Sequence, residues 1–429
     1  MIDPESSSCL SWKKVFEAMD TEKAGPLENK AFLRHVRQYV HAPSHRFAAI
    51  VPPEFSTLCR DELTVLGFSQ TGISEAGVEF TEKLAGCYAA NLWLRTASRI
   101  LCRLPSFRAG ATEELFHKVS AMRWELWLNP EIPLRVSSYV EHSRIEHEGV
   151  VADTFLDGVR KRFIEQGLPA PTAWRPPAGG QESDVSISSW LQRVIVRLDQ
   201  NRCEISLDTT GPHLHERGYR LHHTGAPLRE TLAAAILRKA GWKGDAPLID
   251  GMCGSGTFGI EAALIARRLP PGLGRHFLFE KWPSFQSKTW EYMVRKAAEG
   301  AFNASPVPIV CVDRDLEAVS VARENSERAG VHGDVRLECT SFFDIRPRAF
   351  GLTGGLLVLN PPYGIRIKED VDQLYQRLGN HISTHFNGWQ AAVLAPSRSL
   401  ATYLKIRSPR LWRVDHGGTP VVVVMGKCS

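Results

Sequence analysis

The stretch PLIDGMCGSGTFGIEAALIARR, residues 247–268, decides the fold predicted for this chain. It begins with a short apolar strand over Pro247–Asp250, passes through a glycine-rich turn and continues as a helix over Thr257–Arg268. Glycines let the backbone turn tightly and let a ligand approach closely, and the first turn of the helix offers unpaired N–H groups. This order of elements is typical of a doubly wound α/β domain, where a nucleotide-like ligand lies at the turn.

The spacing of the glycines narrows the class of ligand. It is Gly251-x-x-Gly254-x-Gly256-Thr257, unlike the Gly-x-Gly-x-x-Gly of dinucleotide-binding folds, and it lacks the Gly-Lys-Ser/Thr end of a phosphate loop. A turn without that lysine suits a nucleotide-like ligand that carries no phosphates. The alternative is a turn that only joins the strand to the helix.

Acidic residues after the next two strands fit such a ligand. Asp313, with Arg314 beside it, ends the second predicted strand, where a carboxylate can accept hydrogen bonds from both ribose hydroxyls, while Asp315 is expected to cap the following helix. After the third strand, Asp344 can accept a hydrogen bond from an adenine amino group, with Phe343 against the ring. The alternatives are solvated acids at a helix start, and a core phenylalanine pair beside an exposed aspartate.

A bend without backbone donors follows the apolar strand Gly355–Leu359, where the chain reads Asn360-Pro361-Pro362-Tyr363. Because proline has no N–H and a fixed φ, the bend offers mainly hydrogen-bond acceptors. An exocyclic base amine is a poor nucleophile, since its lone pair is delocalised into the ring. The Asn360 side-chain oxygen and the Pro361 carbonyl can accept both N–H bonds and aim that lone pair at a methyl donor, with Tyr363 stacked on a flipped base. The alternative is an ordinary Pro-Pro loop after a strand.

These motifs resemble those of class I S-adenosylmethionine-dependent methyltransferases of the Asn-Pro-Pro-Tyr type. The segments HERGYR (215–220), APLRETLAAA (226–235) and NLWLRTASR (91–99) further resemble the bacterial 23S rRNA guanine-N2 methyltransferases that carry a THUMP domain, over about residues 50–429. Together, the motifs and the resemblance imply a catalytic set of Asn360, Pro361, Pro362 and Tyr363. They imply a cofactor-binding set of Arg220, Ala226, Pro227, Asp250, Met252, Cys253, Gly254, Gly256, Thr257, Asp313, Arg314, Phe343, Asp344 and Asn360.

The expected fold class is α/β: a C-terminal doubly wound, seven-stranded class I methyltransferase domain preceded by α+β ferredoxin-like and THUMP RNA-binding units. The resemblance implies an N-terminal extension at 1–48, the ferredoxin-like unit at 49–108, the THUMP domain at 109–207 and the methyltransferase domain at 208–429. The alternation of strands and helices in the last part independently favours a parallel sheet, although the apolar pattern alone places only about six strands there. No second methyltransferase domain is expected.

Two local patterns stand out in the N-terminal half. Arg95, Arg99 and Arg103 recur at the helical spacing i, i+4, i+8 and are candidates for contacts with RNA phosphates, with surface or inter-domain pairing within the ferredoxin-like unit as the alternative. Two alternating stretches on either side of Gln200-Asn201 predict a β-hairpin.

Composition sets outer limits on the function. The 429 residues predict two or three domains, and the formal net charge of +5 permits a nucleic-acid partner. Nine cysteines without a Cys-x-x-Cys pair exclude a zinc ribbon and indicate a reduced, cytoplasmic protein. No apolar stretch reaches about 18 residues and the N-terminus has no apolar signal region, so we expect no membrane association. No metal is expected, and the chain is expected to be a monomer or weak oligomer.

The reaction implied by the resemblance is methyl transfer from S-adenosylmethionine to the exocyclic N2 of a guanosine in structured RNA, preferably 23S rRNA. The alternatives are a tRNA guanine-N2 methyltransferase, an adenine-N6 methyltransferase on RNA or DNA, and a non-catalytic RNA-binding ribosome-assembly factor. Two positions depart from the family pattern: Gly251 stands where proline is usual, and Ile365 stands where the rRNA enzymes commonly have glutamate.

Overall fold

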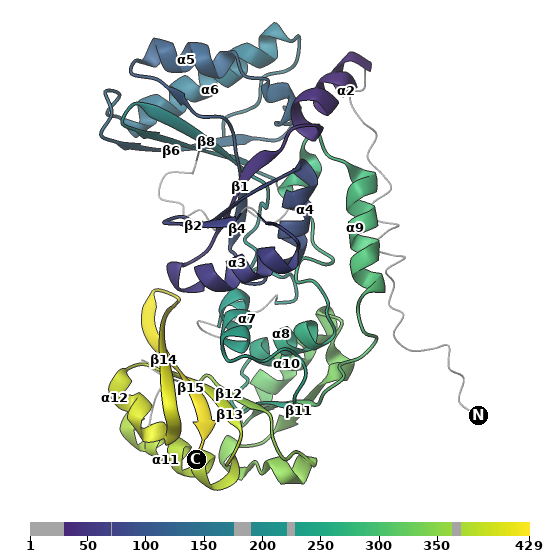
Figure 1. Ribbon diagram of the computed structural model, residues 1–429, viewed down its shortest axis with the longest axis vertical. Coiled ribbons are helices and arrows are strands. Elements are labelled where there is room, and N and C mark those ends of the chain that lie inside the picture. Colours follow the sequence, from purple (N-terminus) through teal and green to yellow (C-terminus); the bar gives the residue numbers. More distant parts are fainter. Residues whose placement is uncertain (1–29, 70, 176–189, 221–227, 363–369) are drawn as a thin grey trace, which may run out of the picture.

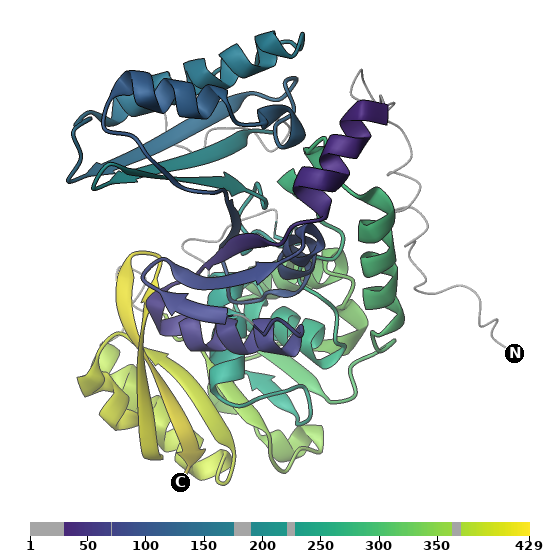
Figure 2. The same ribbon diagram turned by 45° about the horizontal axis from the view of Figure 1, so that its top comes forward.

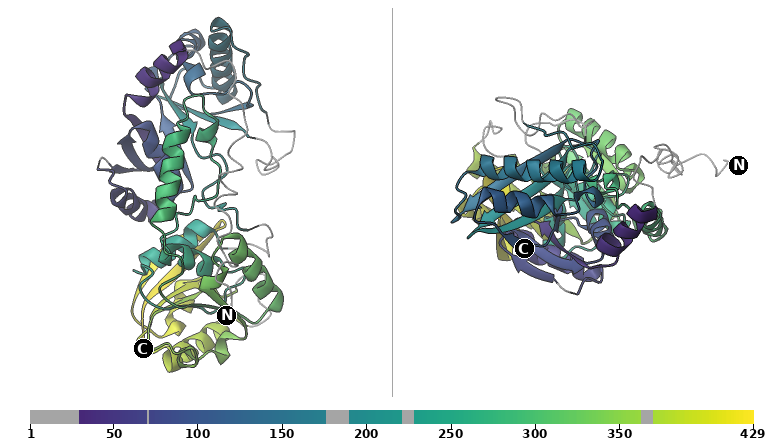
Figure 3. Two further views of the ribbon diagram at one scale, coloured as in Figure 1. Left: turned by 90° about the vertical axis from the view of Figure 1, so that its right-hand side faces the viewer. Right: turned by 90° about the horizontal axis from the view of Figure 1, so that it is seen from above.

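The computed structural model describes residues 30–69, 71–175, 190–220, 228–362 and 370–429. Two β-sheets organise these residues, one of eight strands in the N-terminal half and one of seven strands in the C-terminal half. The sheets occupy different parts of an elongated molecule (Figures 1 and 3). No helix within the described ranges is both long and apolar enough to cross a membrane.

The first unit of the N-terminal half has the topology of a ferredoxin-like fold. Its elements are β1 (His45–Ile50), α3 (Ser56–Val65), β2 (Thr71–Ser74), β3 (Gly77–Glu82), α4 (Leu84–Trp93) and β4 (Arg99–Arg103). The strands lie in the order β2-β3-β1-β4, and all neighbours are antiparallel. Helix α2 (Lys30–Val36) and a π-helical turn precede β1. Because His45 already pairs with Glu82 of β3, the sheet starts before the boundary expected at residue 49.

The second unit continues the same sheet. Its elements are β5 (Phe107–Arg108), α5 (Thr112–Ser120), β6 (Leu134–Glu141), α6 (Glu148–Glu165), β7 (Gln192–Asp199) and β8 (Arg202–Asp208). Strand β8 pairs with β4, which joins the two units, while α5 and α6 lie together over one face of β6–β8 (Figure 2). The predicted hairpin is confirmed: Gln200 and Asn201 have φ of 50° and 60°, as a two-residue turn of the I′ type requires.

The C-terminal sheet has the strand order β11-β10-β9-β12-β13-β15-β14, in which the first five strands are parallel. Strand β15 is antiparallel to both of its neighbours. The strands are β9 (Leu248–Asp250), β10 (Ile309–Asp313), β11 (Val335–Cys339), β12 (Leu356–Leu359), β13 (Gln390–Ala395), β14 (Ile406–His416) and β15 (Thr419–Cys428). The helices are α7 (Glu230–Lys239), α8 (Thr257–Ala266), α9 (Ser287–Glu299), α10 (Leu316–Arg328), α11 (Val371–His385) and α12 (Arg398–Ala401).

This sheet is doubly wound, as predicted, and positions the site. Its central strands are buried on both faces, because successive side chains of β9 and β12 enter two different hydrophobic clusters. Strand β9 lies between β10 and β12, so the strand order reverses beside it. In such a sheet the crevice for a ligand opens at the carboxyl ends of the strands at this point.

Aromatic and polar contacts join the two halves. Tyr88 of α4 stacks on Phe279 at 4.4 Å between ring centroids, and Trp290 of α9 meets Phe279 edge-on at 5.3 Å. The prediction that Arg95, Arg99 and Arg103 share a helical face is wrong, because α4 ends at Trp93 and β4 begins at Arg99.

Arg95 and Arg99 are instead buried, so they are not surface residues, and both make contacts within the protein. Arg99 forms an ion pair with Asp208 at the end of β8. Arg95 bonds to the C-terminal half.

Candidate active site

The turn between β9 and α8 is held to both neighbouring strands. The backbone N–H of Gly251 donates to the Val358 carbonyl of β12 at 3.1 Å, and that of Cys253 donates to the Val312 carbonyl of β10 at 3.0 Å. These bonds fix the glycine-rich turn at the centre of the carboxyl edge of the sheet. Burial raises the pKa of the Cys253 thiol well above its usual range, in keeping with a packing role for this side chain.

The same turn leaves one side open. Gly254 and Gly256 have φ of 51° and 84°, a left-handed backbone that favours glycine. Among the described residues, a Cβ at Gly254 would meet no atom within 4 Å, whereas one at Gly256 would lie 3.0 Å from Ala322 of α10. Asn325 of α10 also donates through Nδ2 to the Ser255 carbonyl at 3.0 Å. Helix α10 therefore supports one side of the turn, and a ligand can approach the Gly254 side.

Asp250 ends β9 with a fully buried carboxylate. Neither oxygen has a hydrogen bond of normal geometry to any described residue. Burial and then the charge of Asp313 raise the pKa of Asp250 well above its usual range, against the opposing backbone N–H groups of Met252 and Gly259. A buried acceptor without a partner is unfavourable unless a ligand or water donates to it. Met252 itself is half-buried beside this carboxylate in the chain.

Asp313 ends β10 and faces the turn. Its Oδ2 accepts from the backbone N–H of Gly254 at 2.9 Å, and its Oδ1 accepts from the N–H of Asp315 at 3.0 Å. The predicted cap is confirmed, because the Asp315 carboxylate accepts from the Glu317 N–H at 3.0 Å. Asp313 is half-buried and the adjoining Arg314 is exposed, so both stand at the rim of the crevice.

The predicted adenine contact lies in a short 3-10 helix, Phe342–Asp344, that follows β11. Asp344 is exposed and Phe343 is half-buried, with the Arg377 guanidinium 4.3 Å from its ring centroid. Phe342 is buried and packs against the glycine-rich turn between β9 and α8, which we also call the cofactor turn. Phe342 therefore belongs to the core, and Phe343 lies at the rim of the crevice.

The Asn-Pro-Pro bend emerges beside the glycine-rich turn. Val358 is in register with Asp250 on the adjacent parallel strand, so Asn360, two residues later, leaves the sheet at the same edge. The Asn360 Oδ1 is buried and has no partner among the described residues, while Pro361 is buried and Pro362 is exposed. The predicted residues Tyr363, Ala226 and Pro227 lie outside the described ranges.

Arg220 reaches the start of α8. Its Nη2 donates to the Thr257 hydroxyl at 2.5 Å and to the Leu228 carbonyl at 3.0 Å, and its Nη1 lies 3.4 Å from a Glu230 carboxylate oxygen. Burial raises the pKa of Glu230 to about 6, although the Arg220 charge lowers it. Arg220 is therefore a support of the cofactor turn. The sequence hypotheses missed Asn325, because a lone asparagine within a helix carries no motif.

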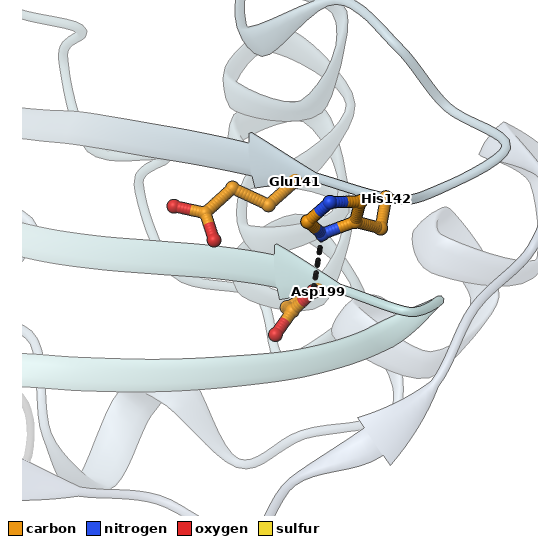
Figure 4. A group of neighbouring side chains, drawn as sticks. All are labelled: Glu141, His142 and Asp199. Carbon is orange, nitrogen blue, oxygen red and sulfur yellow. Dashed lines mark ion pairs between the residues drawn. The ribbon is translucent and has the colours of Figure 1, made fainter.

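Within the described ranges, one group outside this crevice has the composition of a metal site. Glu141, His142 and Asp199 lie at the ends of β6 and β7, with one potential ligand atom each within 4.8 Å of the others (Figure 4). His142 Nδ1 is 3.6 Å from Asp199, and Glu141 pairs with Arg197 at 3.1 Å. Because Glu141 and His142 are exposed and ion pairing accounts for the contacts, we assign this group no metal role.

Comparisons with known proteins agree with this architecture. Residues 217–420 match an RMKL-like methyltransferase domain, and residues 46–101 match an RlmL ferredoxin-like domain. A "Ribosomal RNA large subunit methyltransferase K/L" of Syntrophotalea carbinolica is 36% identical over 87% of this chain and 52% of its own length. The chain therefore spans about half the length of this relative.

Two further proteins match over nearly their whole length. The "Putative RNA methyltransferase slr0064" of Synechocystis sp. is 31% identical over 88% of this chain and 97% of its own length. The solved structure "SMU.472, a putative methyltransferase complexed with SAH" superposes with a TM-score of 0.76 at 28% identity, covering 90% of this chain and 98% of the other. On the fold, the site and these matches, the chain belongs to the RMKL-like family of class I, S-adenosylmethionine-dependent RNA methyltransferases.

Proposed function

We propose that this chain transfers a methyl group from S-adenosylmethionine to the exocyclic N2 of a guanosine in structured RNA, with 23S rRNA as the preferred substrate. The proposal is carried by the Asn360 Oδ1, which is buried, has no hydrogen-bond partner among the described residues and lies in a donor-poor bend beside the glycine-rich turn. The relatives named for methylation of large-subunit ribosomal RNA support the choice of RNA.

The residues at the crevice fit this cofactor. The space over Gly254 admits a ligand against the backbone. The buried Asp250 carboxylate matches a cationic amine, and the rim carboxylate of Asp313 matches two ribose hydroxyls. Phe343 and Asp344 offer a ring and an acceptor for the adenine. When bound, S-adenosylmethionine supplies a methyl group already activated on a sulfonium.

The chain's own residues then prepare the acceptor amine. The Asn360 Oδ1 and the Pro361 carbonyl accept its two N–H bonds, which localises the nitrogen lone pair and directs it towards the methyl donor. One N–C bond forms as the carbon–sulfur bond breaks, and the amine loses a proton to solvent afterwards. Asn360 is thus the catalytic residue of the proposal, and its neighbours position the base.

The N-terminal half is the proposed RNA-holding part. We assign residues 109–207 to a THUMP RNA-binding unit and residues 208–429 to the methyltransferase domain. Strand β8 belongs to the sheet of the ferredoxin-like unit and leads directly into the C-terminal half. The cysteines in the described part of the chain are all free, in keeping with the cytoplasmic location that methylation of ribosomal RNA would imply.

Substitution of Asn360 tests the proposal. Asn360→Ala should lower methyl transfer to 23S rRNA by about 100-fold or more, as removal of one aligned hydrogen-bonding group does in other enzymes. Its affinity for S-adenosylhomocysteine should persist in calorimetry. Asn360→Asp, which keeps an acceptor oxygen, should retain part of the activity.

Nucleoside mass spectrometry of the methylated RNA distinguishes the candidate products. N2-methylguanosine in ribosomal RNA supports the proposal. N2-methylguanosine in transfer RNA, or adenine methylated at N6 in RNA or DNA, would show that the proposed substrate is wrong. The proposed role of Asn360 in methyl transfer to an exocyclic amine would stand. Undiminished transfer by Asn360→Ala would remove the assigned role, and a wild-type protein without transfer would favour an RNA-binding assembly factor.

A further inference from the structure

Helix α8 carries the cofactor turn at its start and is held at its other end by the ferredoxin-like unit. Arg95, in the segment between α4 and β4, donates through Nη2 to the carbonyls of Leu269 at 2.5 Å and Leu264 at 3.4 Å. Leu264 is in the last turn of α8, where its carbonyl also accepts from the Leu269 N–H at 2.9 Å, and Leu269 follows the helix. A cation at this end of the helix suits the helix dipole. Arg95 is buried, so this contact is part of the interface between the two halves.

A second buried arginine, Arg217, joins three segments of the chain. Its Nη2 donates to the Arg95 carbonyl at 2.7 Å, its Nη1 donates to the Leu214 carbonyl at 2.5 Å, and its Nε lies 3.4 Å from Glu261 Oε1. Glu261 is in α8 and is fully buried. The planar guanidinium thus links the ferredoxin-like unit, α8 and its own segment, residues 214–220, which we term the strap.

The strap runs along α8 towards the cofactor turn. The Tyr219 hydroxyl donates to Glu261 at 3.4 Å, and the next residue, Arg220, donates to the hydroxyl of Thr257, one helical turn earlier. Arg328 of α10 donates through Nε to the Tyr219 carbonyl at 2.8 Å. The strap therefore contacts α8 at two residues, Glu261 and Thr257, and Thr257 is the first residue of the helix after the glycine-rich turn.

We propose that Arg217 is a positioning residue for cofactor binding. It holds the strap on α8 and so keeps Arg220 on the cofactor turn, while Arg95 supports the far end of the same helix. In this arrangement the ferredoxin-like unit is a structural part of the cofactor site in addition to any contact with RNA. The inference rests on the cofactor assigned under the proposed function.

Calorimetric titration of the full chain with S-adenosylhomocysteine tests this role. Arg217→Met should raise the dissociation constant about tenfold while the binding stoichiometry stays near one. In turnover, KM for S-adenosylmethionine should rise and kcat at saturation should be retained. A merely structural role would instead lower the fraction of competent protein and leave the dissociation constant of the remainder unchanged.

Arg267 provides a matched control. It also borders α8 and contacts three acceptors, the carbonyls of Phe302 at 3.0 Å and Gly330 at 2.8 Å and the carboxylate of Asp334 at 3.1 Å. All three acceptors belong to the C-terminal half and none belongs to the strap. Arg267→Met should therefore leave the dissociation constant within about twofold of the wild-type value, even if it lowers stability.

Two further variants separate a loss of positioning from the effect of an unpaired buried charge and test the support from the ferredoxin-like unit. Arg217→Met leaves Glu261 buried and unpaired, so a variant that also carries Glu261→Gln removes that charge and should show the same weaker binding. Arg95→Met should raise the dissociation constant about threefold, because it removes a charged hydrogen bond at the remote end of α8.

Wild-type affinity in both Arg217 variants would overturn the proposal. Wild-type affinity in Arg95→Met would overturn the support assigned to the ferredoxin-like unit. If the wild-type chain itself fails to bind S-adenosylhomocysteine, the cofactor assignment fails rather than the role of Arg217.

Discussion

The turn that joins β9 to α8 has no room for a side chain at Gly251. A Cβ there would lie 2.4 Å from Phe342 Cδ2 and 2.5 Å from Leu359 Cδ2, and both side chains are buried in the core. Contacts under 3.0 Å force a shift of the neighbours. Overpacking of a core by one carbon costs about 1–3 kcal/mol, so Gly251→Ala should lower the free energy of unfolding by that amount.

The corresponding change in melting temperature is measurable. One kcal/mol corresponds to about 2–4 °C in a domain of 150–250 residues, so Gly251→Ala should lower Tm by about 2–12 °C. Gly251→Pro should lower it further, because proline also removes the N–H that donates to the Val358 carbonyl at 3.1 Å. Loss of the partner of a buried acceptor costs about 1–3 kcal/mol.

Circular dichroism melting of the full chain without cofactor provides the assay. Gly251→Ala combined with Leu359→Val should lose less stability than the sum of the two single changes, because removal of a methyl group relieves one of the contacts. The resembling methyltransferases usually carry proline at this position, which makes the outcome informative. If Gly251→Pro has the same Tm as the wild type, then the packing of Phe342 and Leu359 does not restrict the turn, and the predicted loss of stability is refuted.

Three further substitutions test the site. Asp313→Ala removes the proposed ribose acceptor and should raise the dissociation constant of S-adenosylhomocysteine about 10- to 100-fold. Asp315→Ala removes only a helix cap, so about 0.5–2 kcal/mol of stability should be lost without weaker binding. Gly254→Ala places a Cβ in the open side of the turn and should weaken binding in calorimetry; an unchanged affinity would contradict the proposed approach. The pKa of Glu230, about 6, exceeds its value of 4.5 outside the fold, so stability should decline as pH rises from 4.5 to 6. Glu230→Gln should remove that decline, about 2 kcal/mol in denaturant titrations, and a persistent slope would assign it to another group.

The parallel core of the C-terminal sheet could be predicted because its strands are buried on both faces. Strands such as Leu356–Leu359 and Gln390–Ala395 consist of short apolar runs bounded by turn residues. Strand β14 was not predicted, because this edge strand carries arginines, a proline and a register irregularity between Arg407 and Arg410. Its main-chain pairing with β15, rather than an apolar pattern, makes it a strand.

The prediction that Arg95, Arg99 and Arg103 share one helical face was wrong because of the local backbone conformation. The apolar periodicity of α4 continues into the residues that follow it, but Leu94 has a ψ of 123° and ends the helix in an extended conformation. Arg95 and Arg99 then point into polar contacts made by segments more than 100 residues away. A spacing rule that assumes one helix cannot recover such contacts.

The convergence of Asp250, Asp313 and Asn360 could be predicted, because each residue ends or follows one of three neighbouring parallel strands. Of the supports of the site, Arg220 was in the predicted set, whereas the roles of Arg217 and Asn325 were not predicted. Arg217 and Asn325 act through hydrogen bonds to backbone carbonyls, and neither a lone arginine in a loop nor a lone asparagine in a helix differs in sequence from a solvated residue.

The site combines two kinds of polar group that differ in how they are satisfied. The supporting groups, Arg217 and Asn325, use their hydrogen-bonding capacity on protein partners and so fix the turn and the strap. Asp250 and Asn360 instead keep buried oxygens without a hydrogen bond of normal geometry in the described part of the chain. Asp250 ends β9, and Asn360 directly follows the adjacent strand β12. Such oxygens reduce stability until something donates to them. An amine-bearing cofactor and an exocyclic base amine are donors of this kind, and a rigid surrounding holds both acceptors in place without reorganisation when those donors bind.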